Sequence, residues 1–329
     1  MPNVAIVGAT GAVGQEFLKI LAERNFPVDE LRLLATSRSA GKKIGWQGRE
    51  LEVGETTYES FKGIDIALFA GGSSSTEFAS AAVDSGAVVI DNSSAFRLND
   101  EVPLVVPEVN PEDVHWHKGI IANPNCSTII MAVALKPIFD LAGIKRIVVS
   151  TYQAVSGAGR DGIEELESQV KAWHNHNEME SKAFPYPIAF NLIPRIDVFQ
   201  EGDYTKEEWK MVKETQKIFH NPEMAITATT VRVPVFRSHS ESINIETEKK
   251  VTVAEVKEAL NKGAGLIVQD EPAQDRYPMP LYTADSDEVY VGRIREDYSI
   301  PSGLNLWVTG DQIRKGAATN AVQIAELLL

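Results

Sequence analysis

The chain carries Gly8-Ala-Thr-Gly11-Ala-Val-Gly14 between an apolar run at residues 4–7 and a helical pattern at residues 12–24. Glycines let the backbone turn tightly and approach a phosphate, and a helix N-terminus supplies free N–H groups and partial positive charge. A glycine-rich turn between strand and helix therefore predicts a nucleotide-phosphate site. Its G-x-x-G-x-x-G spacing departs from the usual G-x-G-x-x-G, so an ordinary glycine-rich turn is the alternative. The predicted contacts are Gly8, Thr10, Gly11, Ala12 and Val13.

This turn opens a series of strands that alternate with helices. Apolar runs predict strands at 4–7, 31–35, 64–70 and 87–91, and helical spacing predicts helices at 12–24 and 76–84. Strands separated by helices form a parallel sheet with helices on both faces. We therefore expect an α/β protein whose N-terminal Rossmann-like, doubly wound domain spans residues 1–125.

The end of the second predicted strand discriminates between nicotinamide cofactors. An NAD-binding domain places an acidic residue there for the ribose hydroxyls. This chain instead has Thr36, Ser37, Arg38 and Ser39. Hydroxyls and a guanidinium suit a 2′-phosphate, which favours NADP; a plain surface arginine is the alternative for Arg38. Ser73, after the third strand, is predicted to line the same crevice.

The second part of the chain has a different pattern. Strands are expected at 144–152, 226–235, 242–246, 289–293 and 304–308. Those at 226–235 and 242–246 alternate as strands of a half-solvated antiparallel sheet would. Helices are expected at 127–141, 205–219 and 252–261, and another carries Ile163, Leu166, Val170 and Trp173 on one face. A final helix at 314–329 has Ala318, Val322, Ala325 and Leu329 on one stripe. We expect an α+β domain at 126–311, with residues 312–329 returning to complete the first domain.

Composition excludes several classes of function. Lys and Arg number 32 and Asp and Glu 46, which gives a net charge of −14 and makes nucleic acids and anionic membranes poor partners. The longest apolar runs, such as 129–135, are far shorter than the roughly 20 residues of a spanning helix. A single cysteine fits a reducing compartment, and no basic leader precedes the first apolar residues. We expect a cytoplasmic protein.

Cys126 is the candidate nucleophile. It lies in Asn123-Pro124-Asn125-Cys126-Ser127-Thr128, directly before the predicted helix at 127–141. A thiol at a helix N-terminus feels the helix dipole, which favours the thiolate. A buried structural cysteine is the alternative. A nucleophilic cysteine beside a nicotinamide suggests aldehyde chemistry through a thioester.

Over essentially its whole length the chain resembles the aspartate-semialdehyde dehydrogenase family, in the form found in Gram-positive bacteria. The segments that carry the resemblance are Gly8–Gly14, Ser93–Arg97, Asn123–Thr128, Gln153–Gly159, Asn191–Pro194, Arg232–Val235, His239-Ser240, Gly292–Arg295 and Arg314–Ala318. The resemblance implies a catalytic domain of the glyceraldehyde-3-phosphate dehydrogenase type that also forms a homodimer. It further implies reversible reductive dephosphorylation of L-aspartyl 4-phosphate to L-aspartate 4-semialdehyde, which serves lysine, diaminopimelate, threonine and methionine synthesis.

The resemblance assigns roles residue by residue. Cys126 attacks the carbonyl, His239 is the general acid and base, and Gln153 orients the substrate. Independently of the resemblance, we expect the amide of Asn125 and the N–H groups at the start of the predicted helix to stabilise the developing oxyanion, because they are hydrogen-bond donors next to the thiol. For the substrate, Arg232 matches the carboxylate clamp, Glu207 the partner of the ammonium group, and Arg97 and Lys210 the phosphate site. Ser156, Gly157 and Gln312 match cofactor contacts, although the family usually has asparagine at the last position.

Several of these residues also fit a purely structural role. His239 alone fits a structural histidine, and Glu207 with Lys210 fits a solvated i,i+3 ion pair. For the protein, the alternatives are N-acetyl-γ-glutamyl-phosphate reductase, whose substrate has no ammonium group for Glu207, and a non-catalytic NADP-binding relative, which would have no need of the nucleophile. Two His-x-His pairs, at 115–117 and 174–176, lack further ligands, so no metal is predicted.

Overall fold

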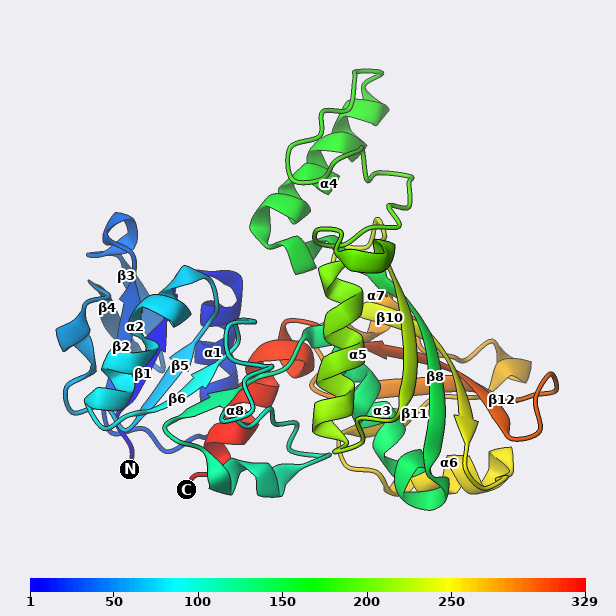
Figure 1. The fold of residues 1–329 in the computed structure, drawn as a ribbon. Coiled ribbons are helices and arrows are strands. Elements are labelled where there is room, and N and C mark those ends of the chain that lie inside the picture. Colours follow the sequence, from blue (N-terminus) through cyan, green and yellow to red (C-terminus); the bar gives the residue numbers. More distant parts are fainter. The chain divides into compact units, whose positions relative to one another are not determined.

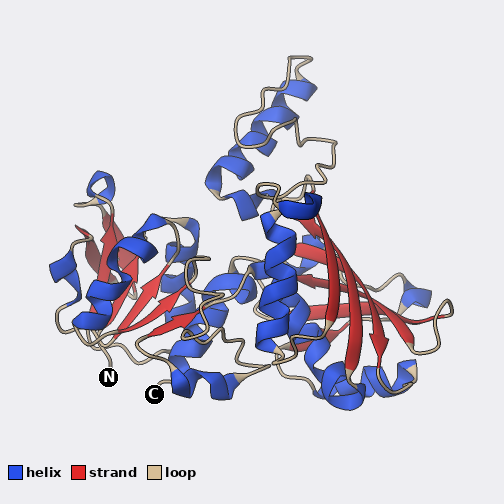
Figure 2. Cartoon of the chain, viewed as in Figure 1, coloured by secondary structure: helices blue, strands red, loops and turns tan.

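A computed structural model describes all 329 residues. The chain divides into two compact units, residues 1–125 with 316–329 and residues 126–315. Figure 1 labels many elements of each unit, and Figure 2 colours helices and strands differently. None of the helices combines the length and the apolar character needed to cross a bilayer.

The first unit contains a seven-stranded sheet in the order β3-β4-β2-β1-β5-β6-β7. Six of these strands run parallel, and only β3 is antiparallel to its neighbour β4. This confirms the Rossmann-like doubly wound sheet. The strands are β1 Val4–Val7, β2 Leu31–Ala35, β3 Lys43–Trp46, β4 Arg49–Glu55, β5 Ile66–Phe69, β6 Val88–Asp91 and β7 Ile120–Ala122, and the helices are α1 Ala12–Glu23, α2 Ser73–Asp84 and α8 Thr319–Glu326.

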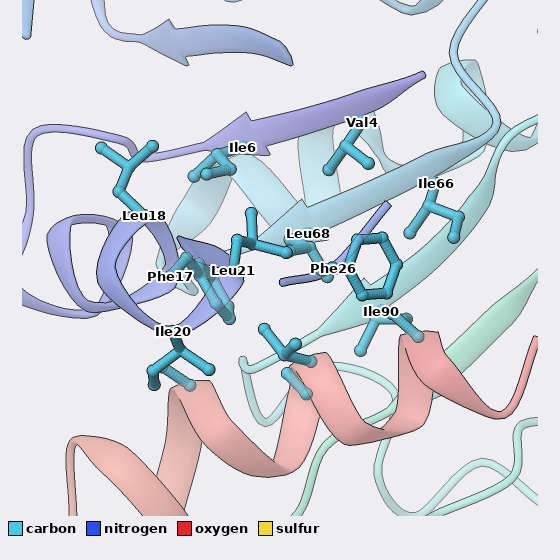
Figure 3. Packing of buried hydrophobic residues seen from close by; sticks show 14 of the residues in the cluster. Val4, Ile6, Phe17, Leu18, Ile20, Leu21, Phe26, Ile66, Leu68 and Ile90 are labelled. Carbon is cyan, nitrogen blue, oxygen red and sulfur yellow. The ribbon is translucent and has the colours of Figure 1, made fainter. Parts of the chain in front are cut away.

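One of the two core clusters of this unit lies between the sheet and two helices that are far apart in the sequence. Phe17 and Leu21 of α1 are fully buried against Ile6 and Leu68 of the sheet, as Figure 3 shows. Helix α8 adds Ala321, Val322, Ile324 and Ala325 to the same cluster. The C-terminal residues are therefore part of the first hydrophobic core. Leu329, expected on the buried stripe, is exposed because α8 ends at Glu326.

The second unit is built on a six-stranded mixed sheet in the order β11-β12-β13-β10-β8-β9. Its strands are β8 Ile144–Gln153, β9 Ala225–Arg232, β10 His239–Thr247, β11 Leu266–Val268, β12 Val289–Asp297 and β13 Gly303–Gly310, and its helices are α3 Cys126–Ala142, α4 Arg160–His174, α5 Lys206–Ile218, α6 Val253–Lys262 and the short α7 Pro280–Thr283. Helix α3 packs against α5, α6 and the sheet. This confirms the α+β architecture of the second part.

Strand β9 is parallel to β8, with a register from Arg146 opposite Ala225 to Gln153 opposite Arg232. The expectation that it belongs to an antiparallel arrangement is wrong, because alternation of apolar residues reports a half-buried strand and carries no information on direction. The parallel pairing has a direct consequence. Gln153 and Arg232, the last residues of two neighbouring strands, lie side by side at one edge of the sheet.

Helix α4 protrudes from the second unit (Figure 1) and packs only part of its apolar face. Leu166 is buried in a cluster with Val155 and Ile188, and Ile163 packs against that cluster. Trp173, expected on the same buried face, is 57% exposed, and its ring packs beside that of Phe190, 4.8 Å away between centroids. Val170 is exposed too. Helical spacing therefore predicted the apolar face of α4 correctly, but it did not predict which residues of that face are covered by other parts of the chain.

Candidate active site

The candidate catalytic side chains meet at one edge of the second sheet. Gln153 ends β8, Arg232 ends β9 and His239 begins β10. Since β10 is antiparallel to β8, its first residue lies at the edge where β8 and β9 finish. Cys126 is the first residue of α3. Four residues spread over more than 100 positions of sequence are thus brought together within one unit.

Cys126 and His239 form the centre of this cluster. The Sγ atom of Cys126 lies 3.5 Å from Nε2 of His239, and the thiol is partly exposed while the imidazole is completely buried. The position of Cys126 at the start of a 17-residue helix exposes the sulfur to the positive end of the helix dipole. This arrangement favours an anionic sulfur that receives a hydrogen bond from the ring.

The other ring nitrogen of His239 fixes its tautomer. Nδ1 accepts a hydrogen bond from the main-chain N–H of Ala154 at 3.1 Å. Because Nδ1 is an acceptor, the neutral ring carries its proton on Nε2, the atom that faces Cys126. Burial lowers the pKa of His239 well below its usual range, and the charge of Arg232 lowers it further. The ring is therefore neutral near pH 7 and presents an N–H to the sulfur.

Arg232 is held rigidly beside His239. Its Nη1 donates to the carbonyl oxygen of Ala154 at 2.7 Å, and its guanidinium carbon lies 5.7 Å from the ring centroid of Phe184. Gly157 covers this pair closely: a Cβ at Gly157 would stand 2.7 Å from Nη1 of Arg232 and 3.3 Å from Cε1 of His239. A buried, oriented guanidinium of this kind suits bidentate binding of a carboxylate.

Gln153 connects the cysteine turn to an acidic residue of α5. Its Nε2 donates to Oγ of Ser127 at 2.9 Å and contacts Oε1 of Glu207 at 3.3 Å. The other oxygen of Glu207 accepts from Nζ of Lys210 at 2.9 Å, and this ammonium also reaches Asp197 at 3.1 Å. Burial works against the charge of Lys210, but the two carboxylates outweigh it and raise its pKa. Glu207 and Lys210 therefore form a largely buried pair rather than a solvated one.

Asn125 and Arg97 belong to the first unit, at the turn that precedes Cys126. Both side chains are buried. Arg97 donates through Nε to the carbonyl oxygen of Asn123 at 2.9 Å and through Nη2 to that of Asn92 at 2.8 Å. Arg97 therefore braces the backbone of the cysteine turn, a structural contact that the sequence did not indicate.

The predicted phosphate turn has the geometry that its glycines require. Gly8 has φ +86°, and a Cβ at Gly14 would overlap the carbonyl oxygen of Gly8. Helix α1 begins at Ala12, and its N-cap residue Gly11 offers no side-chain cap for the first N–H groups. Thr10 is exposed beside them and Val13 is half-buried. The turn thus presents an open helix N-terminus that fits a phosphate group.

Hydroxyl and basic side chains gather where β2 ends. Ser37, Arg38 and Ser39 form a single turn of 3₁₀ helix with Thr36 at its N-cap position, and Arg38 is exposed. The Oγ of Ser39 lies 3.4 Å from Oγ1 of Thr10 and 3.5 Å from Nζ of Lys42. Lys42 was not among the predicted residues, because no motif marks it and its place depends on the hairpin β3–β4, which the sequence did not reveal.

Ser73 lies in the first turn of α2. The expectation that this helix begins at residue 76 is wrong, because Ser73, Ser74 and Ser75 are already helical. The residue before them, Gly72, has φ +86° and provides no side-chain cap. The serines therefore belong to a second open helix N-terminus in the first unit, rather than to a loop.

Ser156, Gly157 and Gln312 lie in the second unit, close to His239. Ser156 and Gly157 belong to a 3₁₀ turn at Val155–Ala158 that follows β8. Gln312 follows the end of β13, and its amide contacts both Ser156 and the main chain of Ser238. No group of three or more His, Cys, Asp and Glu side chains is arranged to hold a metal ion.

Glu241 is a buried carboxyl that sequence inspection missed. It lies two residues after His239 on β10, opposite Thr151 of β8, and is 0% exposed. Neither of its oxygens has a hydrogen bond to protein. Burial raises the pKa of Glu241 well above its usual range, so folding favours the protonated, neutral carboxyl. The signal for this residue was weak, since an acid inside an alternating strand pattern is normally assigned to the solvated face.

We predict that Glu241→Gln stabilises the protein increasingly as the pH rises above the ordinary glutamate pKa. The unfolded chain releases the proton at the ordinary glutamate pKa, so the free energy of unfolding of the native protein falls by about 1.4 kcal/mol per pH unit as pH rises from there toward the folded pKa. Glutamine has nearly the same shape as glutamic acid but does not ionise, so the variant does not lose stability in this way as the pH rises. Thermal unfolding at pH 5.5, 7 and 8.5 should show a gain in Tm that grows with pH; a constant difference would contradict the buried neutral acid.

Comparison with known proteins agrees with this geometry. The family model described as "Semialdehyde dehydrogenase, NAD binding domain" matches residues 3–117, and "Semialdehyde dehydrogenase, dimerisation domain" matches residues 135–315. The fold, the nucleotide turn and the cysteine–histidine pair therefore define a two-domain semialdehyde dehydrogenase.

The relatives narrow the family. The aspartate-semialdehyde dehydrogenase of Aquifex aeolicus is 61% identical, over 99% of this chain and 98% of its own length. A crystal structure of aspartate semialdehyde dehydrogenase II from Vibrio cholerae complexed with ASA has a TM-score of 0.96 at 50% identity, covering 100% of this chain and 98% of that one. The enzyme with NADP from Candida albicans has a TM-score of 0.77 at 27% identity and covers 100% and 98% of the two chains. The chain belongs to the aspartate-semialdehyde dehydrogenase family, which confirms the resemblance seen in its motifs.

Proposed function

We propose that this chain catalyses the reversible, NADP-dependent reductive dephosphorylation of L-aspartyl 4-phosphate to L-aspartate 4-semialdehyde. The observation that carries the proposal is the pair formed by Sγ of Cys126 and Nε2 of the buried His239, 3.5 Å apart at a helix N-terminus. The ion-binding side chains around this pair suit a substrate that has both a carboxylate and an ammonium group. Family membership supports the same reaction. In metabolism it would serve lysine, diaminopimelate, threonine and methionine synthesis.

In the reductive direction, Sγ of Cys126 attacks the acyl carbon and the carbon–oxygen bond to phosphate breaks, which leaves a thioester on the chain. Bound NADPH supplies the hydride that reduces this thioester. The resulting hemithioacetal oxyanion collapses, breaking the carbon–sulfur bond, so that aldehyde leaves and the thiolate of Cys126 is restored. The N–H groups at the start of α3 and the amide of Asn125 stabilise the negative oxygen.

His239 acts in this proposal as a hydrogen-bond donor at Nε2. The N–H of Ala154 occupies Nδ1, so the neutral ring directs its proton toward the sulfur and toward an oxygen bound next to it. The collapse of an oxyanion to aldehyde and thiolate needs no net proton. The general acid–base role expected from the resemblance is therefore narrowed here to stabilisation of thiolate and oxyanion by Nε2–H.

Substrate binding uses the charged groups around this pair. Arg232 is proposed to clamp the substrate carboxylate, and Glu207 to receive the ammonium group, with Gln153 aligning the carbonyl. Glu207 now contacts Lys210, so the ammonium of the substrate would share this carboxylate. Lys210 and Arg97 are proposed to bind the phosphate. This set favours aspartyl phosphate over an N-acetylated substrate, which offers Glu207 no positive charge.

The proposed cofactor site uses the turn before α1, the residues after β2 and the start of α2. Gly8, Gly11, Thr10, Ala12 and Val13 are proposed to hold the pyrophosphate. The 2′-phosphate is assigned to Thr36, Ser37, Arg38 and Ser39, with Lys42 added by its contact to Ser39. Ser73, Ser156 and Gly157 are proposed to contact the rest of the cofactor. Gln312, expected among these contacts from the resemblance, is not assigned to them, because both ends of its amide are bonded to the chain. The relative that carries NADP supports this choice of nucleotide.

Arg38→Ala should raise the KM for NADP⁺ by about 10-fold or more and should leave any rate measured with NAD⁺ unchanged, because the guanidinium is assigned to the 2′-phosphate alone. The measurement is initial rate against each nucleotide. Arg49→Ala, at an exposed arginine of β4 in the same unit, is the matched control and should behave as the native chain. Equal effects on both nucleotides would contradict the assignment of Arg38.

The remaining proposals concern organisation and location. We assign NADP binding to the first unit, and catalysis and homodimer formation to the second, whose family model is a dimerisation domain. Exposed aromatic side chains on the second unit, among them Trp173, Tyr186 and Phe199, support a covering partner surface. The single, reactive cysteine supports a cytoplasmic location.

The function is tested by the absorbance of NADPH formed from aspartate semialdehyde, phosphate and NADP⁺. Formation that requires all three supports the proposal. Reaction only with N-acetylglutamate semialdehyde would assign the chain to N-acetyl-γ-glutamyl-phosphate reduction. A folded chain that binds NADP⁺ and reduces it with neither aldehyde would be a non-catalytic relative.

A further inference from the structure

Gln312 lies beside the segment that leads into His239, and only 4% of its surface is exposed. Its Oε1 accepts a hydrogen bond from the main-chain N–H of Ser238 at 2.9 Å, and its Nε2 donates to Oγ of Ser156. One amide therefore joins the residue before His239 to the turn that follows Gln153.

The segments that Gln312 joins are those that contain Ala154 and His239. These two residues form the hydrogen bond that fixes the tautomer of His239. The N–H of Val155 donates to the oxygen of Val235 at 2.8 Å, and Oγ of Ser156 donates to that of Phe236 at 2.5 Å. The N–H of Ala154, one residue earlier, donates to Nδ1 of His239. Gln312 completes this series of contacts at Ser238.

The backbone at Ser238 needs such support. Its φ of +72° lies in the left-handed region, which a residue with a side chain rarely adopts. A conformation of this kind persists only where the surroundings hold it. Gln312 holds the N–H of Ser238, and Oγ1 of Thr283 lies 2.8 Å from its Oγ. Because His239 follows directly, this backbone sets the direction of the imidazole.

We propose that Gln312 is a positioning residue that, through Ser238 and Ser156, keeps the His239 ring against the N–H of Ala154 with its Nε2 proton directed at Cys126. The inference rests on the proposed function for its kinetic readout and on the structure alone for its spectroscopic one. It goes beyond a contact with the cofactor, because both ends of the amide are bonded to the chain itself.

The kinetic test compares Gln312→Ala and Gln312→Asn with Gln274→Ala, at an exposed glutamine of the same unit. We expect kcat of Gln312→Ala to fall about 10-fold to 100-fold while the KM for NADP⁺ changes by less than about twofold, because the loss is one of alignment. Because asparagine is one methylene shorter than glutamine, the kcat of Gln312→Asn should lie between those of Gln312→Ala and the native chain. The kcat of Gln274→Ala should match that of the native chain. An unchanged kcat with a raised KM for NADP⁺ would overturn the proposal in favour of a cofactor contact.

The second readout is the ¹⁵N spectrum of selectively labelled histidine, which reports the nitrogen that carries the proton and needs no turnover. His239→Gln assigns the signal. The native chain should show the Nε2–H form, and Gln312→Ala should show a mixture of tautomers. A native ring protonated on Nδ1 would overturn the proposal even if the Gln312 variants failed to fold. An inactive native chain with the expected tautomer would support this inference and contradict the proposed function.

Discussion

Cys126→Ala should abolish phosphate-dependent formation of NADPH, with kcat lowered by at least about 10³-fold. The sulfur forms the covalent bond to the substrate, and no neighbouring group takes its place. The hydroxyl of Ser127, the next residue, accepts a hydrogen bond from the amide of Gln153, and Ser127 is completely buried. Serine at position 126 should be nearly as inactive, because its hydroxyl is a far weaker nucleophile than a thiolate near neutral pH.

The control for this variant is cofactor binding. The proposed NADP contacts of residues 8–13 and 36–39 lie in the other unit, so the affinity for NADP⁺ should stay at the native value. Alkylation adds a direct test, since the chain has one cysteine and a single adduct can only be at Cys126. Adduct formation should inactivate the native chain in proportion to labelling. Turnover retained by Cys126→Ser would contradict the thioester.

Gly157→Ala should lower kcat/KM by about 100-fold without unfolding the protein. The added Cβ would stand 2.7 Å from Nη1 of Arg232, closer than real Cβ contacts, and 3.3 Å from the ring of His239. Arg232 cannot retreat freely, because the same Nη1 donates to the oxygen of Ala154. The methyl group therefore displaces the proposed carboxylate clamp, and loss of substrate affinity should dominate.

The matched control is Gly45→Ala. Gly45 lies in β3, and a Cβ there would meet nothing within 4 Å. Initial rates against aspartate semialdehyde, with Tm measured alongside, separate the two variants. Gly45→Ala should keep native kinetics. Native kinetics in Gly157→Ala would show that Arg232 and His239 have room to move and that their geometry is not critical.

Much of the first unit could be predicted because its signals are local. The turn 8–14 combines a strand end, required glycines and a helix start within a few residues, and each feature constrains the backbone directly. The hairpin β3–β4 escaped prediction because its strands are polar and mostly exposed, with β3 at the edge of the sheet, so no apolar run marks them. In the second unit, the direction of β9 and the exposure of Trp173 depended on which elements pack nearby.

The sequence by itself determined most strands of the two sheets, the nucleotide turn and the candidate reactive groups, since apolar periodicity, glycine positions and residue chemistry are properties of short segments. Only the tertiary structure decided how those groups are paired. The hydrogen bond from the N–H of Ala154 to Nδ1 of His239 joins residues 85 positions apart in the sequence. The hydrogen bond from Gln312 to Ser156 joins residues 156 positions apart. Contacts of such separation depend on strand order and register, which no local pattern encodes, and they set the tautomer and orientation on which the proposed chemistry depends.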